Sequence, residues 1–508
     1  MDITLGLDLG TTNCKVLALD TQGQQVASAT APTPVHPRST DPSSPEYEAI
    51  ALWELSGRLI REVLAQLTPE QRVAGLAVTS MAEAGVLLDA AGQALFPILT
   101  WHDRRTQPWR AWWGARLTQA EIYGITGLPL DHIYSVNKIL WQRDFDPFTF
   151  ARAQTWLCLA DWITFCLTGE RATSFSQASR TMLFDIRGRA WSDDLLRLAG
   201  LAPALMPPAL PSGQIVGRVT AGAAGATGLP AGTPVVSGGH DHICAALAAG
   251  VVAPGPVLDS AGTAEAILFP LDAPILTKTA ADAGVCCGHH TVRDRYYLVG
   301  GVMSGAVTGW LGRLLAGDAS AATLAGLMDE AMAAPLMANG VWFLPYLGGS
   351  GPPDRDPAAW GAWLGLRLKH SRADLMRAAM EGLAFAVRYL LEGLQGVTGS
   401  PITELRAVGG GSRHPWWQSL KADVLGLPVE TPAVTDVTAQ GAALLAGIGV
   451  GLYRDATEAA ALAHRPARRF EPDPARHAVY DQAYHEVYLK LYPTLQGLPL
   501  GEKVNSEQ

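Results

Sequence analysis

A cluster of ionisable side chains follows two glycines near the middle of the chain, in the segment Gly238-Gly239-His240-Asp241-His242. Two kinds of chemistry fit it. Asp241 is suited to act as a general base that takes a proton from a substrate hydroxyl. Alternatively, the two histidines form a His-x-His metal-ligand pair, which either His102-Asp103 or His289-His290 completes. A surface turn that carries histidines is the third alternative.

Four glycine-rich turns are candidate phosphate sites. Exposed backbone N–H groups in such turns bind phosphate oxygens, and threonine hydroxyls add donors. The aspartate at the strand end beside the first turn is suited to hold Mg²⁺ through water. Lys15, on the next strand, can reach a transferred phosphate as a point charge. Each turn taken alone is also explained as an ordinary turn. The four are Asp8-Leu9-Gly10-Thr11-Thr12, Ala261-Gly262-Thr263, Gly300-Gly301 with Gly305, and Gly409–Ser412.

Several common enzyme motifs are missing from the sequence. It contains no P-loop motif, no Gly-x-Gly-x-x-Gly dinucleotide motif and no Gly-x-Ser-x-Gly nucleophile motif. The six cysteines form no Cys-x-x-Cys pair, which argues against a cysteine-based metal site or a disulfide framework. A net charge of -9 without a long basic block argues against binding to duplex DNA or an anionic membrane.

The length of 508 residues predicts more than one domain, and a hydrophobic fraction of 48% with 15 tryptophans excludes a disordered chain. The first residues lack the basic start of a signal peptide. No apolar run reaches the roughly 20 residues that a membrane span needs. We therefore expect a cytoplasmic protein.

The elements that must position these residues alternate between strands and helices, which favours an α/β fold. A strand–turn–strand unit near the N-terminus is repeated about half the chain later, and this echo suggests two duplicated lobes. Ser371-Arg372-Ala373-Asp374 is typical of a capping box at a helix start. We predict strands at 3–9, 15–19, 25–29, 73–80, 256–260 and 265–269, helices near 46–67 and from about Trp416, and helices beyond about Leu452.

Two segments carry a family resemblance. The stretch from Gly361 to Leu366, followed after seven residues by Asp374 to Glu381, resembles the C-terminal signature of the FGGY carbohydrate kinases. These belong to the superfamily of sugar kinases, heat-shock chaperones and actin. The first turn, Asp8–Thr12, is similar to their first phosphate loop, and Ala178–Asp185 is similar to a stretch of glycerol kinases. The resemblance covers nearly the whole chain.

The resemblance implies two ribonuclease-H-like lobes, of the actin-like ATPase type, that flank a deep catalytic cleft. Residues 1–248 would form the N-terminal lobe, with the sugar site, the catalytic aspartate and the first phosphate loop. Residues 249–508 would form the C-terminal lobe, with the nucleotide site and the C-terminal helices. A homodimer is the assembly to test, with no nucleic-acid or membrane partner.

The implied activity is transfer of the ATP γ-phosphoryl group, with Mg²⁺, to a hydroxyl of a ketose or small polyol. The ketose would be a pentulose or deoxyketose such as xylulose or fuculose. A glycerol- or erythritol-type polyol kinase is the alternative. Two remote alternatives are a metal-dependent hydrolase and a non-catalytic, nucleotide-operated binding protein.

The family pattern also implies residue roles. Asp241 would be the catalytic base, and Asp8 would position Mg²⁺, through water. The sugar would contact Glu83, Trp101, Asp103, His242 and Asp241. The nucleotide would contact Gly10, Thr11, Thr12, Lys15, Gly262, Thr263, Gly305, Gly410 and Gly411. Trp101 is also explained as a core residue, and Asp103 as the partner of Arg104 or Arg105.

The sugar-side positions do not follow one subfamily. Xylulokinases usually show Gln-Met-His-Gly where this chain has Met81-Ala82-Glu83-Ala84. Glu83 and Trp101 match the pattern of glycerol kinases, whereas Ala82 and Ile133 stand where those enzymes carry Arg and Tyr. This mixture leaves the identity of the sugar open.

Overall fold

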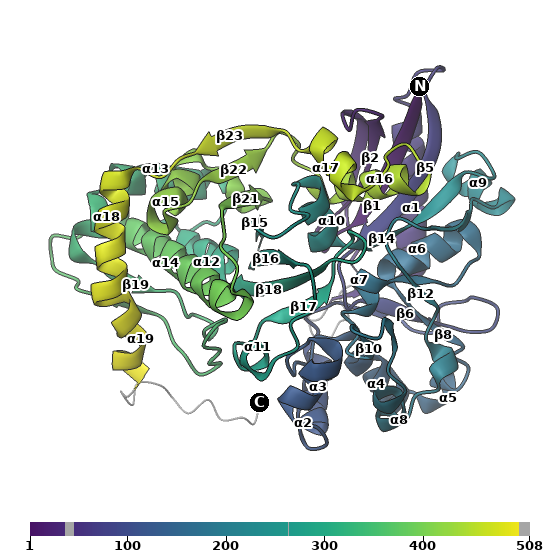
Figure 1. The fold of residues 1–508 in the computed structure, drawn as a ribbon, viewed down its shortest axis with the longest axis horizontal. Coiled ribbons are helices and arrows are strands. Elements are labelled where there is room, and N and C mark those ends of the chain that lie inside the picture. Colours follow the sequence, from purple (N-terminus) through teal and green to yellow (C-terminus); the bar gives the residue numbers. More distant parts are fainter. Residues whose placement is uncertain (36–44, 263, 497–508) are drawn as a thin grey trace. The chain divides into compact units, whose positions relative to one another are not determined.

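The computed structural model describes residues 1–35, 45–262 and 264–496 (Figure 1). These residues form two compact units, each assembled from three segments. Unit 1 comprises Met1–Leu258, Leu268–Val299 and Pro432–Arg465, and unit 2 comprises Asp259–Ile267, Gly300–Thr431 and Pro466–Gln508. The division of the chain at residues 248 and 249 stays a prediction. Thr263, expected at the β-phosphate, lies outside the described residues.

The strands are β1 (Asp2–Leu9), β2 (Asn13–Asp20), β3 (Gln25–Pro32), β4 (Glu46–Tyr47), β5 (Arg72–Ser80), β6 (Gly85–Leu88), β7 (Ile98–Leu99), β8 (Thr155–Cys158), β9 (Thr173–Ser174), β10 (Phe184–Asp185), β11 (Ala190–Trp191), β12 (Ala209–Leu210), β13 (Ile215–Arg218), β14 (Pro234–His240), β15 (Pro256–Ala261), β16 (Glu265–Leu271), β17 (Cys286–His289), β18 (Tyr296–Val302), β19 (Trp342–Leu344), β20 (Ala362–Leu364), β21 (Glu404–Val408), β22 (Val429–Pro432) and β23 (Pro466–Phe470).

The α-helices are α1 (Ala49–Leu64), α2 (Gln107–Gly114), α3 (Gln119–Thr126), α4 (Ser135–Phe145), α5 (Pro147–Phe150), α6 (Leu159–Thr168), α7 (Phe175–Ala178), α8 (Asp193–Ala199), α9 (Ala221–Thr227), α10 (Asp241–Ala248), α11 (Lys278–Asp282), α12 (Ser304–Ala316), α13 (Ala321–Ala333), α14 (Arg372–Thr398), α15 (Pro415–Leu425), α16 (Val437–Gly449), α17 (Ala456–Ala463), α18 (Pro474–Ala483) and α19 (Leu489–Gln496). Short 3₁₀ turns include η1 (Arg104–Thr106) and η4 (Gly410–Ser412).

The main sheet of unit 1 has the strand order β13-β14-β5-β1-β2-β3. β1 pairs antiparallel with β2 and parallel with β5, and β5 pairs parallel with β14. Because side chains alternate between the two faces of a strand, Leu5, Leu7 and Leu9 enter one core together with α1 and α6. The predicted N-terminal strands and the helix near 46–67 are thereby confirmed.

The opposite face of β1 is covered by α16, which lies over this sheet although it is more than 400 residues away in the chain (Figure 1). Gly6 makes this approach possible, since a Cβ at this position would collide with the Ala439 carbonyl oxygen and the Ala443 nitrogen of α16. Asp8 follows two residues later on the same face of β1. The start of α16 is thereby placed beside Asp8.

In unit 2, the strands follow the order β16-β15-β21-β22-β23. The capping box is confirmed: the Ser371 hydroxyl accepts from the Asp374 N–H, and Asp374 accepts from the Ser371 N–H. α14 then runs to Gly399, whose left-handed conformation ends the helix. The expectation of helices alone beyond Leu452 is wrong, because β23 continues the sheet there.

Within the described ranges, no helix has both the length and the apolar character that a membrane crossing demands.

Candidate active site

Three neighbouring parallel strands of the unit 1 sheet, β1, β5 and β14, bring predicted site residues to one edge of that sheet. Parallel strands have their carboxyl ends at the same edge of a sheet, where ligands of α/β proteins bind. Asp8 lies at the end of β1, Glu83 follows β5, and Asp241 follows β14. Residues separated by up to 233 positions in the chain are thus collected on one side of unit 1.

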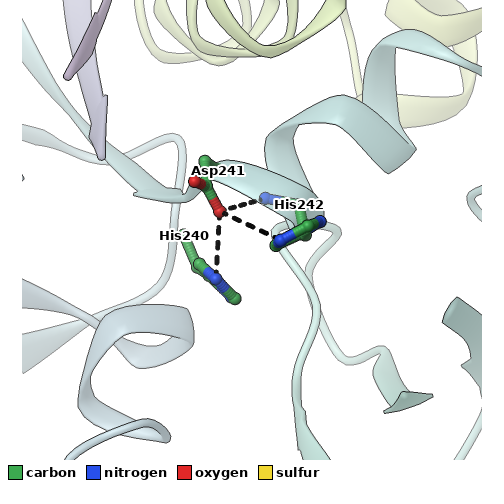
Figure 2. Close-up of side chains that lie close together, drawn as sticks. All are labelled: His240, Asp241 and His242. Carbon is green, nitrogen blue, oxygen red and sulfur yellow. Dashed lines mark hydrogen bonds and ion pairs between the residues drawn. The ribbon is translucent and has the colours of Figure 1, made fainter. Parts of the chain in front are cut away.

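Asp241 is the first residue of α10, and its carboxylate is held by its two neighbours (Figure 2). The His242 backbone N–H donates to Asp241 Oδ1 at 2.6 Å, and His240 Nε2 lies 3.0 Å from the same oxygen. Burial raises the pKa of Asp241, but the adjacent imidazoles and these hydrogen bonds outweigh burial and lower it to about 2. The side chain is 24% exposed, so an ionised carboxylate is presented at the surface of unit 1.

The same three residues are the candidate metal group, since one ligand atom of each lies within 4.8 Å of the others. Within the described part of the chain, neither His102-Asp103 nor His289-His290 joins this group. His290 has both ring nitrogens engaged, because Nδ1 accepts from the Val292 N–H and Nε2 lies 3.1 Å from the Val251 carbonyl oxygen. The metal-hydrolase alternative therefore lacks the completing pair that it requires.

Asp8 lies in a cluster of three carboxylates and one lysine. It is 7% exposed, and its Oδ1 has no hydrogen-bond partner among the described residues. Burial raises the pKa of Asp8 well above its ordinary value; repulsion from Asp241 and Asp436 adds to the rise, and Lys15 opposes it. Lys15 Nζ lies 2.5 Å from Asp436 Oδ1, at the start of α16. An excess of negative charge is therefore collected around Asp8, and its role in holding Mg²⁺ stays a prediction.

The predicted phosphate loop is the hairpin between β1 and β2. Gly10 closes it by donating its N–H to the Asn13 carbonyl oxygen at 3.1 Å. Thr11 and Thr12 are exposed at the tip, and the Thr11 hydroxyl lies 3.8 Å from the Met81 sulfur. Their contact with a phosphate stays a prediction.

Glu83 forms a buried ion pair with Arg180, the residue that follows α7 by two positions. Arg180 Nη2 lies 2.5 Å from Glu83 Oε1, and Nε donates to the same oxygen at 2.7 Å. Glu83 adopts a left-handed conformation with φ 65°, which costs about 1–3 kcal/mol in a non-glycine residue. Ser135 stabilises this turn by donating to the Glu83 carbonyl oxygen. His242 interacts electrostatically with both members of the pair.

The other two sugar-side residues differ in their surroundings. Trp101 is half-buried, and its carbonyl oxygen accepts from Lys138 Nζ at 3.3 Å. Asp103 is fully buried and binds the Arg105 guanidinium, with Oδ2 2.6 Å from Nη2. It also accepts from the Arg105 N–H as the cap of η1. The ion pair with Arg105 thus explains why Asp103 is buried. Contact of Asp103 with a sugar stays a prediction without structural support.

The remaining nucleotide-side glycines lie in unit 2. Gly262 is in the turn between β15 and β16, and Gly410 and Gly411 form η4 after β21. The two turns touch: a Cβ at Gly409 would lie 2.7 Å from the Ala261 carbonyl oxygen, and one at Gly411 would lie 2.9 Å from the Ala261 Cβ. Gly305 is in the first turn of α12.

Sequence reasoning left three partners out of the site: Arg180, Asp436 and Lys138. Arg180 lies in the stretch Ala178–Asp185 that is similar to glycerol kinases, so a charged side chain inside that motif was the available signal. Asp436 had no local signal, because its role depends on the packing of α16 against β1.

Comparison with known proteins identifies relatives over nearly the whole chain. Two family models match, and both describe the FGGY family of carbohydrate kinases. Residues 3–248 match its N-terminal domain, and residues 259–450 match its C-terminal domain. A glycerol kinase of Gloeobacter violaceus is 33% identical, covering 92% of this chain and 91% of its own. A xylulose kinase of Escherichia coli is 30% identical, covering 98% of this chain and 99% of its own.

A solved structure of xylulose kinase from Rhodospirillum rubrum matches with a TM-score of 0.88 and 32% identity, covering 97% of this chain and 99% of that one. The expected α/β class, with a sheet and helices in each of two units, is confirmed.

Proposed function

Because the chain belongs to the FGGY family of carbohydrate kinases, it is a phosphotransferase with an alcohol group as acceptor, and we propose that its acceptor is a ketose and its donor ATP. The observation that carries the site assignment is the meeting of Asp8, Glu83 and Asp241 at one sheet edge. A proton acceptor, a cation site and a hydroxyl-binding carboxylate are the parts that phosphoryl transfer to an alcohol requires.

Asp241 is the proposed proton acceptor. With its pKa lowered to about 2, it is ionised at neutral pH and ready to accept the proton of the attacking hydroxyl. His240 and the His242 N–H fix the carboxylate by hydrogen bonds to Oδ1, which leaves Oδ2 to accept the proton. Positioning of this kind supplies most of the rate in phosphoryl transfer, where the protein makes no covalent bond.

Asp8 and Asp436 are the residues that would hold Mg²⁺, Asp8 through water. The unpartnered buried Oδ1 of Asp8 and the excess of negative charge around it fit a hard cation with oxygen ligands. Bound Mg²⁺ would neutralise phosphate charge. Lys15 would exchange its contact with Asp436 for the transferred phosphate. Thr11 and Thr12 offer N–H and hydroxyl donors, while the Gly10 N–H keeps the hairpin closed.

The Glu83–Arg180 pair supports a ketose as acceptor. Glu83 retains lone pairs that accept hydrogen bonds from sugar hydroxyls, and the buried Arg180 Nη1 is a donor without a partner in the described chain. A ketose offers both a hydroxyl for the carboxylate and a carbonyl oxygen for the guanidinium. Glycerol has no carbonyl. The half-buried face of Trp101 would pack on the carbon skeleton.

A screen of acceptors tests this proposal. D-xylulose, fuculose, erythritol and glycerol are compared by kcat/KM, with ADP release as the signal. We expect a ketose to give the highest value. In Arg180→Met, we expect kcat/KM for that ketose to fall about 10- to 100-fold and that for glycerol to fall much less, because only the ketose loses a hydrogen-bond partner.

The ratio of the two acceptors within one preparation cancels any loss of folded protein. Arg187→Met, an exposed arginine of the same segment, is the matched control and should leave the ratio unchanged. A clear preference of the wild type for glycerol would refute the ketose and favour the polyol alternative. An equal loss of kcat/KM for both acceptors would show that Arg180 does not recognise the carbonyl group of the ketose.

A further inference from the structure

Unit 2 contains a buried charged cluster that the proposed reaction does not use. Lys421, Asp259 and Glu265 are each fully buried, with no exposed surface. Lys421 Nζ lies 2.5 Å from Asp259 Oδ2 and 2.5 Å from Glu265 Oε1, and 4.8 Å from the centre of the Trp417 ring. Burying three ionisable groups is costly unless they satisfy one another, so such a cluster marks a position that the fold must specify.

The two carboxylates flank the turn that carries Gly262. Asp259 lies on β15 and Glu265 is the first residue of β16, so a single ammonium group joins both strands at the base of the turn. Lys421 itself comes from α15, which follows the glycine turn of η4. The ammonium therefore connects three elements at one point.

α15 also contacts the second glycine turn. Gln418, one helical turn before Lys421, is fully buried and directs its Nε2 toward the Gly411 carbonyl oxygen at 3.5 Å. The two turns meet at Ala261, as the close approaches of Gly409 and Gly411 require. One face of α15 thus holds both turns that are proposed to bind the nucleotide.

The charges of the cluster balance only when Lys421 is present. Burial, and then the charge of Glu265, raise the pKa of Asp259 to about 8, although Lys421 opposes the rise. Burial also raises the pKa of Glu265, but Lys421 outweighs burial and lowers it. Both carboxyl groups thus depend on the Lys421 ammonium group for a partner of opposite charge.

We propose that Lys421 is a positioning residue for nucleotide binding, which acts through Asp259 and Glu265 to hold the Gly262 turn in register with the Gly410-Gly411 turn. This inference rests on the proposed function, since it assumes that the two turns bind the nucleotide. Without the ammonium, one carboxylate is left buried and unpaired, and β15 and β16 separate at the base of the turn.

The test measures the affinity of the full chain for MgADP by isothermal titration calorimetry. In Lys421→Met, which keeps the length of the side chain, we expect the dissociation constant to rise at least ten-fold. In steady-state assays with the best acceptor of the screen, the KM for ATP should rise while the KM for the acceptor stays unchanged. Lys369→Met, an exposed lysine of unit 2, is the control.

Calorimetry separates positioning from a general loss of fold. A merely structural role would lower the binding stoichiometry, because fewer molecules are folded, and would leave the dissociation constant of the folded fraction unchanged. That outcome overturns the inference. If Lys421→Met does not fold, Glu265→Gln serves instead, since an amide of equal size still accepts from Lys421; we expect a rise of at least three-fold, and an unchanged constant refutes the inference.

Failure of the underlying function gives a different result. If the wild type does not bind MgADP, the proposed nucleotide site is wrong. If the wild type binds MgADP and Gly411→Ala does not weaken it, the turns are not the site, because the added Cβ would lie 2.9 Å from the Ala261 Cβ. Tight binding by the wild type that Gly411→Ala weakens and Lys421→Met does not affect overturns the role of Lys421 alone.

Discussion

Asp241 is the single residue from which we expect the largest effect on the reaction. In Asp241→Asn, the amide keeps the size of the side chain and an oxygen that accepts from the His242 N–H, but it cannot take a proton at neutral pH. We expect kcat to fall about 10²- to 10⁴-fold, with little change in the affinity for MgADP. Steady-state kinetics and calorimetry measure the two quantities. A variant with more than about a tenth of wild-type kcat would remove Asp241 from the role of base.

At the scale of elements, the contact between α16 and β1 places Asp436 beside Lys15 and Asp8. We expect Gly6→Ala to destabilise unit 1 by about 1–3 kcal/mol, because the added methyl group collides with the Ala439 carbonyl oxygen. The loss is measured by urea unfolding followed by tryptophan fluorescence. Gly222→Ala, in the exposed helix α9 with open space around the Cβ, is the control and should be neutral or slightly stabilising. Equal effects of the two substitutions would contradict the close packing of α16.

For the whole molecule, we expect His289 and His290 to make a contribution to stability that is lost as the pH drops from 7 to 5. Burial lowers the pKa of His289 and of His290 from 6.5 to about 4, although hydrogen bonds to backbone carbonyls oppose the shift. Between these values the unfolded chain binds protons that the folded chain excludes, so acid favours unfolding. Each histidine contributes roughly 2 kcal/mol to the loss between pH 7 and pH 5.

The variant His290→Gln checks this expectation. A glutamine amide can still donate toward the Val251 carbonyl oxygen, but it does not titrate. Urea unfolding at pH 7 and pH 5 should therefore show that the variant loses roughly 2 kcal/mol less than the wild type. If wild type and variant lose the same amount between the two pH values, His290 is not responsible for the acid sensitivity.

Local patterns in the sequence were enough to predict secondary-structure elements and to identify the family. The capping box at Ser371, the turn at Gly10 and the strand at 73–80 are each encoded within a few neighbouring residues. The hydrogen bonds of caps and turns form between such neighbours, so the sequence patterns that encode them can be recognised without knowledge of the fold. The FGGY signature around Asp374 is likewise a local pattern, and it indicates the carbohydrate kinases without any tertiary contact.

Only the tertiary structure decided which charges meet. Arg180 and Glu83 are 97 residues apart, Lys15 and Asp436 are 421 apart, and Lys421 lies 162 residues from Asp259. No spacing rule connects such pairs, because their proximity depends on which strands are neighbours and which helix covers them. The sequence by itself therefore determined the reaction class and the predicted turns. The packing of α16 and α15 decided which partners hold those turns, since the energy of a buried charge depends on groups that only the folded chain brings together.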